Sequence, residues 1–194
     1  MIPRKEEFVI VLDFLPHGKS SEAMKEPVAQ VLGEFNFTLL EVVTRPILPI
    51  ESKQRIYIGK DERKEVDHIK GRIEYNQLTS NAQANLHDAV HSVILQREAD
   101  FVAFINRAGP ISIRSHMLEL LPGIGKKHLD AIMAARSAKP FENFKDFHER
   151  VAHVTSIDEV FTQRIIEELK GESKYHLFTK SPKREDEREE RQWR

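Results

Sequence analysis

The chain has 194 residues, with 30 Lys and Arg against 31 Asp and Glu, so its formal net charge is −1. This length and an apolar fraction of 40% suffice for the core of one or two globular domains. Since the chain has no cysteine, disulfides, thiol catalysis and cysteine zinc sites are excluded. The near-neutral charge also excludes a global basic field, so any binding of nucleic acid must rest on local chemistry.

The expected location follows from what the sequence lacks. No apolar run approaches the roughly 20 residues of a membrane span, and the first 18 residues lack the pattern of a secretory signal. A chain without cysteine suits a reducing compartment. We therefore expect a cytoplasmic protein with no membrane partner.

The first part of the chain has the pattern of β-strands. Around residues 55–58, for example, the apolar Ile56 and Ile58 alternate with polar side chains, which is typical of a strand with one solvent-exposed face. Such short strands favour a small barrel or a strongly curved sheet. The predicted strands are residues 8–15, 28–32, 37–43, 55–58 and 68–75.

From about residue 80 onward, apolar residues recur with helical spacing, and residues that favour helix ends stand at the boundaries. The predicted helices are residues 80–97, 100–107, 114–121, 126–138, 143–150 and 156–170. The expected caps are Ser80, Asn143 paired with Asp146, a capping box of Ser156 and Glu159, and a C-terminal Gly171.

Strands followed by helices predict an α+β fold with two domains. We expect a β domain at residues 1–78, a helical domain at residues 79–171 and a charged, flexible tail at residues 172–194. In the tail, charges of both signs alternate and little is apolar, so it does not have the composition of a basic nucleic-acid arm.

The sharpest local pattern is LLPGIGKK at residues 120–127, between two predicted helices. Pro122 ends the first helix, and Gly123 and Gly125 permit backbone conformations that other residues avoid. Ile124 is expected to point into the core and hold the loop in place. The pattern therefore predicts a tight, fixed connection between the two helices.

The amides after this turn stand at the N-terminus of the next helix. N–H groups there lack intrahelical acceptors and the helix dipole is positive, so a phosphate oxygen can bind beside Lys126 and Lys127. The alternative is a simple helix–helix turn. Such a turn needs one glycine only, and two glycines followed by two lysines favour phosphate binding.

The segment resembles the helix-hairpin-helix motif of non-sequence-specific nucleic-acid binders, over residues 118–151. Arg136 stands where that family often has arginine, and PFENFKDF at residues 140–147 is similar to the segment that follows in tandem versions. The resemblance implies that residues 123–127 grip one backbone phosphate, with a bridging monovalent cation as the only cofactor. Residues 151–156, where the tandem family has a second hairpin, contain no glycine and are expected to be structural.

Over residues 5–171 the chain also resembles an uncharacterised archaeal family described as RNA- or nucleotide-binding. The resemblance implies a small N-terminal OB-like β-barrel followed by an all-α helix-hairpin-helix bundle. It favours RNA over DNA as the partner, together with ribosome- or RNA-processing-associated proteins.

A second contact with nucleic acid is expected on the β domain. OB-folds bind single strands by stacking bases on aromatic side chains and by following phosphates with Lys and Arg. Arg55, Tyr57 and Lys60 have the residue types for this, and Arg55 and Tyr57 are expected to share a strand face. An ordinary solvated strand face explains the same residues equally well.

A protein-interaction or assembly factor is the alternative function from another class. Helix-hairpin-helix regions can keep the fold and lose the phosphate, and residues 112–171 hold nine basic and nine acidic residues. If Glu119 and Asp130 neutralise the hairpin, this alternative gains weight.

An enzyme is the third alternative. The hairpin is similar to that of DNA glycosylases, some of which use a lysine at the position of Lys127, with an aspartate about twenty residues later. Asp146 lies near that distance, but within the structural PFENFKDF segment. We therefore expect no catalytic residue and no enzyme activity.

His87 and His91 are four residues apart on one predicted helix face and could hold zinc. Asp88 stands where the metalloprotease pattern has glutamate, and no third ligand is evident in the sequence. Surface or packing histidines are the preferred interpretation, so no metal site is predicted.

Overall fold

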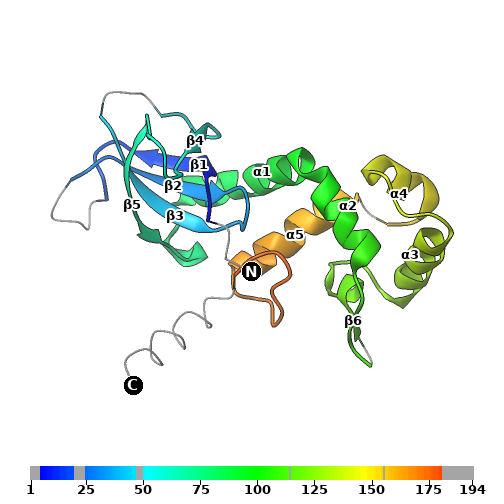
Figure 1. Cartoon of the computed structure of the whole chain (residues 1–194). Helices are drawn as coiled ribbons and strands as arrows, with labels where there is room; N and C mark the ends of the chain where they lie inside the picture. Colours follow the sequence, from blue (N-terminus) through cyan, green and yellow to red (C-terminus); the bar gives the residue numbers. More distant parts are fainter. Residues whose placement is uncertain (1–4, 20–24, 47–49, 114, 155, 181–194) are drawn as a thin grey trace, which may run out of the picture. The chain divides into compact units, whose positions relative to one another are not determined.

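The computed structural model describes residues 5–19, 25–46, 50–113, 115–154 and 156–180, coloured along the chain in Figure 1. The chain forms two compact units, one of Met1–Ala89 with Glu167–Arg194 and one of Val90–Ile166. The expected boundary at residue 78 differs from this division, which falls within helix α1 (Ser80–Gln96). Part of the C-terminal region belongs to the first unit, which no local pattern in the sequence indicates.

The first unit contains a five-stranded antiparallel sheet with the strand order β4-β1-β2-β3-β5. All five predicted strands are confirmed, with small shifts at their ends. The expected third strand starts late because Phe37, at φ 52°, has a left-handed backbone. The strands are β1 (Phe8–Leu15), β2 (Val28–Gly33), β3 (Leu39–Thr44), β4 (Arg55–Tyr57) and β5 (Val66–Arg72).

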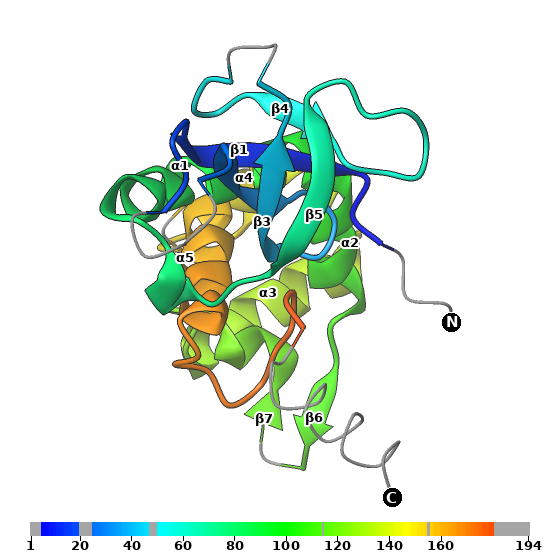
Figure 2. The same ribbon diagram turned by 90° about the vertical axis from the view of Figure 1, so that its left-hand side faces the viewer.

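The sheet is curled but open. Register shifts interrupt the β1–β2 pairing between Val11 and Asp13 and the β3–β5 pairing at two places, and such bulges bend a strand. The bend of β5 beside β3 is visible in Figure 2. Within the described residues β4 and β5 form opposite edges and do not pair. The closed OB-like barrel is therefore not confirmed, and the sheet is half of a barrel.

Both faces of the central strands are buried. One face carries the apolar core, with Val11, Val31 and Val42 fully buried. On the other face buried polar groups meet the start of α1: the Thr79 hydroxyl donates to Asp13 Oδ2 at 2.6 Å, and the Thr79 N–H donates to Gln30 Oε1 at 2.8 Å. These bonds attach the helix to the sheet within this unit.

The second unit holds the end of α1 and the helices α2 (Glu98–Arg107), α3 (Lys126–Ala138), α4 (Phe144–Arg150) and the start of α5 (Ile157–Leu169). The prediction of a helix at residues 114–121 is wrong. A two-stranded ladder of β6 (Pro110–Ser112) and β7 (Ser115–His116) precedes a short 3-10 helix, η2 (Met117–Leu120). This unit is therefore not all-α, because Pro110 pairs with His116 across a turn.

Side chains accept backbone N–H groups at the start of α1, α4 and α5. Asn143 Oδ1 accepts the Asp146 N–H at 2.8 Å, as expected. The cap of α1 is Thr79 rather than Ser80, since the Thr79 hydroxyl accepts the Ala82 N–H at 3.0 Å. At the start of α5, the Ile157 N–H donates to the His148 ring at 3.2 Å.

The C-terminal region is hydrogen-bonded to Glu168. The buried carboxylate of Glu168 accepts the N–H groups of Leu177, Phe178 and Thr179 at 2.7–3.0 Å. Gly171 ends the preceding helical segment at φ 75°, as expected. The expectation of a flexible tail from residue 172 stays a prediction, although these bonds connect residues 177–179 to Glu168, and residues 181–194 lie outside the described part. None of the described helices is both long and apolar enough to cross a membrane.

Candidate nucleic-acid interface

Of the two hairpin glycines, Gly123 has a backbone conformation that other residues avoid, whereas the same expectation is wrong for Gly125. The Ile124 N–H donates to the Leu121 carbonyl at 3.1 Å, which closes a tight turn. Gly123 lies at φ 77°, a left-handed conformation that side chains disfavour. Gly125 is the N-cap of α3 with an extended backbone, and Ile124 is 4% exposed. The expected core position of Ile124 is therefore confirmed.

The start of α3 is open. A Cβ atom added at Gly123 or at Gly125 would meet nothing within 4 Å, and both Lys126 and Lys127 are exposed. The first intrahelical bond runs from the Leu129 N–H to the Gly125 carbonyl, so the amides before Leu129 have no intrahelical acceptor. The glycine at the N-cap offers them no side-chain acceptor, and the first turn contains no acidic residue.

One hairpin contact was missed by sequence reasoning. The ring Nδ1 of His128 lies 2.9 Å from the Gly123 carbonyl, and in the tautomer with a proton on Nδ1 it donates to that oxygen. This bond fixes the left-handed turn from the helix side. The signal in the sequence was a histidine in the first turn of the helix after the two glycines.

Glu119 does not lie against the hairpin amides as a cap. Its Oε2 accepts the His116 N–H at 2.8 Å, and the His116 ring accepts the Leu118 N–H, which together form a capping box on η2. Asp130 is exposed on α3. Glu119 therefore does not neutralise the hairpin in the way that the protein-interaction alternative requires.

Arg136 has internal partners. Its Nη1 donates to the carbonyls of Ile105 and Ala108 at 2.7 and 2.8 Å, at the C-terminal end of α2. A cation at that end of a helix satisfies orphan carbonyls and is favoured by the dipole. The geometry explains Arg136 as a tie between α3 and α2 and leaves its phosphate contact as an expectation only.

The imidazole of His116 lies close enough to Arg136 to be affected by its charge. Burial and, second, the positive charge of Arg136 lower the pKa of His116, while Glu119 raises it. The Nε2 atom of His116 is buried and has no hydrogen-bond partner among the described residues. The ring is therefore neutral at pH 7, with Nδ1 accepting from Leu118.

The expected strand contacts lie in the first unit, whereas the hairpin lies in the second. The guanidinium of Arg55 donates to both carboxylate oxygens of Glu34 at 2.6 and 2.9 Å and lies 3.5 Å over the Phe8 ring. Tyr57 packs edge-on against the same ring at 5.2 Å, so the two side chains do share a face. Its hydroxyl bonds to Asp61 at 3.2 Å, and Lys60 is exposed.

A groove in the first unit was missed by sequence reasoning. Its volume is about 720 Å³, and its lining includes Arg72, Tyr75, Gln77, Lys170 and Lys180. The ammonium of Lys170 lies 5.4 Å from the centre of the Tyr75 ring. These five residues come from β5, from the segment after it and from the segment after α5, so only the tertiary fold brings them together.

The DNA glycosylase alternative requires Asp146 to act as the catalytic aspartate. The Asp146 carboxylate accepts the Glu142 N–H at 3.0 Å and pairs with Arg150 at 2.9 Å. The hydrogen bond from the Glu142 N–H and the pairing with Arg150 lower the pKa of Asp146. Arg150 in turn donates to the Ala135 and Lys139 carbonyls at 2.6 Å. Asp146 is thus held as part of the α3–α4 connection.

His87 and His91 do not act as a pair in the structure. His87 is half-exposed and lies 3.8 Å from Asp88 Oδ1, whereas His91 Nε2 lies 2.7 Å from Asp158 Oδ2 and 3.6 Å from Glu159 Oε1. Burial raises the pKa of Asp158, but hydrogen bonds from His91 and Ser156 outweigh it, so the net pKa is lowered.

The architecture defines a mixed α+β protein in which a curled, open antiparallel sheet accompanies a helical unit with a glycine hairpin. The family model of the protein of unknown function DUF655 matches residues 5–180. The chain belongs to this family.

Two relatives agree with this assignment, and both come from archaea. The uncharacterized protein MJ0038 of Methanocaldococcus jannaschii is 41% identical over 181 residues, which are 92% of this chain and 82% of that protein. The crystal structure of Af1531 from Archaeoglobus fulgidus, of the same family, matches with a TM-score of 0.84 and 42% identity, over 90% of this chain and 100% of that one. The second match supports the curled sheet and the helices as described.

Proposed function

We propose that the protein binds nucleic acid without sequence specificity, through one backbone phosphate held at residues 122–127. The observation that carries the proposal is the open N-terminus of α3, with a glycine as its cap and exposed Lys126 and Lys127 beside it. Free amides and a positive dipole end favour an anion, and phosphate contacts do not read bases. The resemblance to RNA- or nucleotide-binding proteins favours RNA.

The roles within the hairpin follow from its geometry. Pro122 and the left-handed Gly123 form the turn, and Ile124 anchors it to the core. Gly125 leaves the space that a phosphate would occupy, since no neighbour lies within 4 Å of an added Cβ. Lys126 and Lys127 supply the charge.

The contacts of the hairpin give less support to a bound monovalent cation than to direct phosphate binding. A cation that bridges hairpin and phosphate needs free carbonyl oxygens in the hairpin. The Gly123 carbonyl already faces the ring nitrogen of His128 at 2.9 Å. Direct amide contacts therefore account better for phosphate binding here.

The second contact with nucleic acid, on the β domain, involves fewer available side chains than the sequence suggested. Nucleic acid that binds Arg55 must replace Glu34, and contact with the Tyr57 hydroxyl competes with Asp61. Lys60 is exposed and can add a phosphate contact. We therefore expect modest affinity that falls steeply with salt, because few phosphates are neutralised.

A titration of the full chain with single- and double-stranded RNA and DNA, at two salt concentrations, tests the proposal. Gly125→Val is the sharp variant, since φ at Gly125 is −89° and its Cβ meets nothing, so the fold tolerates a side chain that fills the phosphate position. We expect a loss of about tenfold or more in affinity for Gly125→Val and for Lys127→Glu, and a smaller salt slope for the lysine variant.

The matched control is Lys145→Glu, which changes an exposed lysine of α4 by the same charge. Circular dichroism of each variant confirms the fold. If wild type binds none of the four ligands, or if Lys145→Glu weakens binding as much as Lys127→Glu, the hairpin is not the binding site.

A protein-interaction factor is the second candidate, favoured by one observation. Ile113, between β6 and β7, is fully exposed, and Leu95 is 50% exposed in the same unit. Exposed large apolar side chains can mark protein contacts. If Ile113→Asp abolishes co-purification of a partner while the hairpin variants do not, this function replaces the first.

A further inference from the structure

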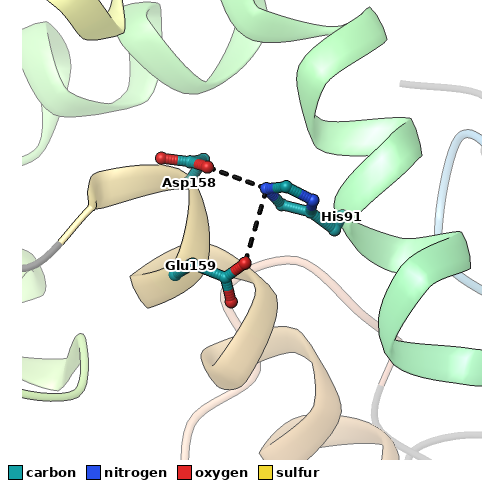
Figure 3. Close-up of side chains that lie close together, drawn as sticks. All are labelled: His91, Asp158 and Glu159. Carbon is teal, nitrogen blue, oxygen red and sulfur yellow. Dashed lines mark hydrogen bonds and ion pairs between the residues drawn. The ribbon is translucent and has the colours of Figure 1, made fainter.

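His91, Asp158 and Glu159 form a cluster that uses two helices of the second unit. His91 lies in α1, and the two carboxylates are neighbours in the first turn of α5. Figure 3 shows both carboxylates directed at the same ring nitrogen, Nε2 of His91. The three ligand atoms lie within 4.8 Å of one another, although the residues are 67 positions apart in the chain.

Asp158 is held in place by groups outside the cluster. The Ser156 hydroxyl donates to its Oδ1, so Oδ2 is the oxygen that faces His91. The Thr162 hydroxyl donates to the Asp158 carbonyl at 2.8 Å. Hydrogen bonds of this kind orient metal ligands in known sites. The side chains are partly buried, at 28% exposure for His91 and 16% for Asp158.

The ring nitrogen of His91 faces two carboxylate oxygens and forms a hydrogen bond with one of them. An imidazole carries one hydrogen on Nε2, and the 2.7 Å distance assigns it to Asp158. Glu159 Oε1, at 3.6 Å, is too far for a hydrogen bond to the same atom. One ring nitrogen and two carboxylate oxygens therefore converge, which is a set of donor atoms that a divalent cation can bind.

We propose that His91 Nε2, Asp158 Oδ2 and Glu159 Oε1 bind one divalent transition-metal ion, with zinc as the first candidate. Tetrahedral zinc with bonds of about 2.0–2.1 Å places its ligand atoms roughly 3.3–3.4 Å apart. The Nε2–Oε1 distance of 3.6 Å is close to that value. The Nε2–Oδ2 distance of 2.7 Å widens when the intervening proton leaves.

The chemistry of the donors selects the metal class. One imidazole nitrogen and two carboxylate oxygens suit zinc and its first-row neighbours, whereas magnesium prefers an all-oxygen shell. When the metal binds Nε2, the single proton of the neutral ring is released from Nε2 and Nδ1 takes up a proton from solvent, so the ring stays neutral. Three protein ligands leave a coordination position for water. No hairpin residue takes part, so this site is independent of the proposed function.

An ion pair without a metal is the competing explanation. Carboxylates at a helix N-terminus are stabilised by the dipole, and a histidine beside them links two helices. That explanation predicts a loss of stability in His91→Ala but no affinity of wild type for zinc. The two explanations therefore differ in a direct binding measurement.

The test is a calorimetric titration of Zn²⁺ into the full chain without an affinity tag, paired with thermal unfolding in the presence and absence of Zn²⁺. The matched control is His87→Ala, one turn earlier on α1 and half-exposed. We expect one zinc ion per wild-type chain and a rise in the unfolding midpoint. His91→Ala and Asp158→Asn weaken binding at least about tenfold, since second-shell losses alone cost that much. His87→Ala binds as wild type does.

Glu159→Gln keeps the test decisive if His91→Ala fails to fold, because its side chain is 42% exposed and the substitution preserves volume. We expect weaker zinc binding in this variant too. The proposal is overturned if wild type shows no saturable site, if His87→Ala loses as much affinity as His91→Ala, or if Glu159→Gln binds zinc like wild type.

Discussion

The hairpin at residues 122–127 and the strand β4 both contain basic residues. Their charged side chains have different surroundings in the structure. Lys126 and Lys127 extend from a helix start that has no acidic neighbour in its first turn. Arg55 in β4 is held by both oxygens of Glu34 and by the Phe8 ring. A basic residue in a sequence is therefore a candidate for ligand binding only when the fold leaves its charge unsatisfied.

Arg136 extends the comparison into the helical unit itself. Like Arg55, it matches a pattern of nucleic-acid binders, and like Arg55 it is occupied by groups of its own unit. Cations that hold the fold should therefore affect stability when they are replaced, and cations that face solvent should affect binding.

The first prediction concerns Arg136→Ala. The substitution leaves the Ile105 and Ala108 carbonyls without their charged donor, and we expect the free energy of unfolding to fall by about 2–3 kcal/mol. Denaturant unfolding measures this. Lys127→Ala is the control and should change the free energy by less than about 0.5 kcal/mol. If the two substitutions lower the free energy of unfolding equally, Arg136 does not stabilise the fold more than Lys127 does.

The second prediction compares the two hairpin glycines. Gly123→Ala places a side chain at φ 77° and should cost about 1–2 kcal/mol of stability. Gly125→Ala keeps φ at −89° in open space and should cost less, about 0.5–1 kcal/mol, which is the cost of alanine as a poorer N-cap than glycine. Thermal unfolding ranks the variants. The reverse order would mean that the turn is not as described.

The third prediction concerns Arg55→Ala. Loss of the Glu34 pair and of the contact with Phe8 should lower stability by about 1 kcal/mol, since both groups are partly exposed. The affinity for nucleic acid should change less than twofold. A larger loss of affinity than for Lys127→Glu would move the binding site to the sheet.

The fourth prediction is a pH dependence from His116. Burial and the charge of Arg136 lower its pKa below the ordinary 6.5. Between the two pKa values the unfolded chain binds more protons, so stability falls as the pH drops through about 6.5 and levels off below the folded pKa. Unfolding at pH 5 to 8 should show a smaller slope in His116→Gln. Identical slopes would contradict the lowered pKa.

Much of the fold could be predicted because it depends on near neighbours in the chain. The helix at residues 126–138 begins and ends as predicted, and Asn143 caps the next helix as predicted. Both depend on residues within one turn. The prediction of a helix at residues 114–121 was wrong because Pro110 and His116 pair in an antiparallel ladder. The hydrophobic period of the sequence does not reveal such a pairing.

The candidate sites divide in the same way. The glycine hairpin could be recognised because the turn, its buried isoleucine and its lysines are consecutive. The groove beside Tyr75 and the cluster at His91 could not, since their residues come from distant segments. The sequence pattern pairs His91 with His87, whereas Asp158 lies 67 positions further along the chain.

The strands, most of the helices and the hairpin follow from local sequence patterns, because hydrophobic period, glycine and capping act over a few residues. Contacts between distant segments are needed to explain why β4 and β5 do not pair among the described residues, why Arg55 and Arg136 bond within their own units, and why two carboxylates lie beside His91. These outcomes depend on which distant surfaces are buried against each other. Partners of a charge are chosen by that packing and not by the order of residues.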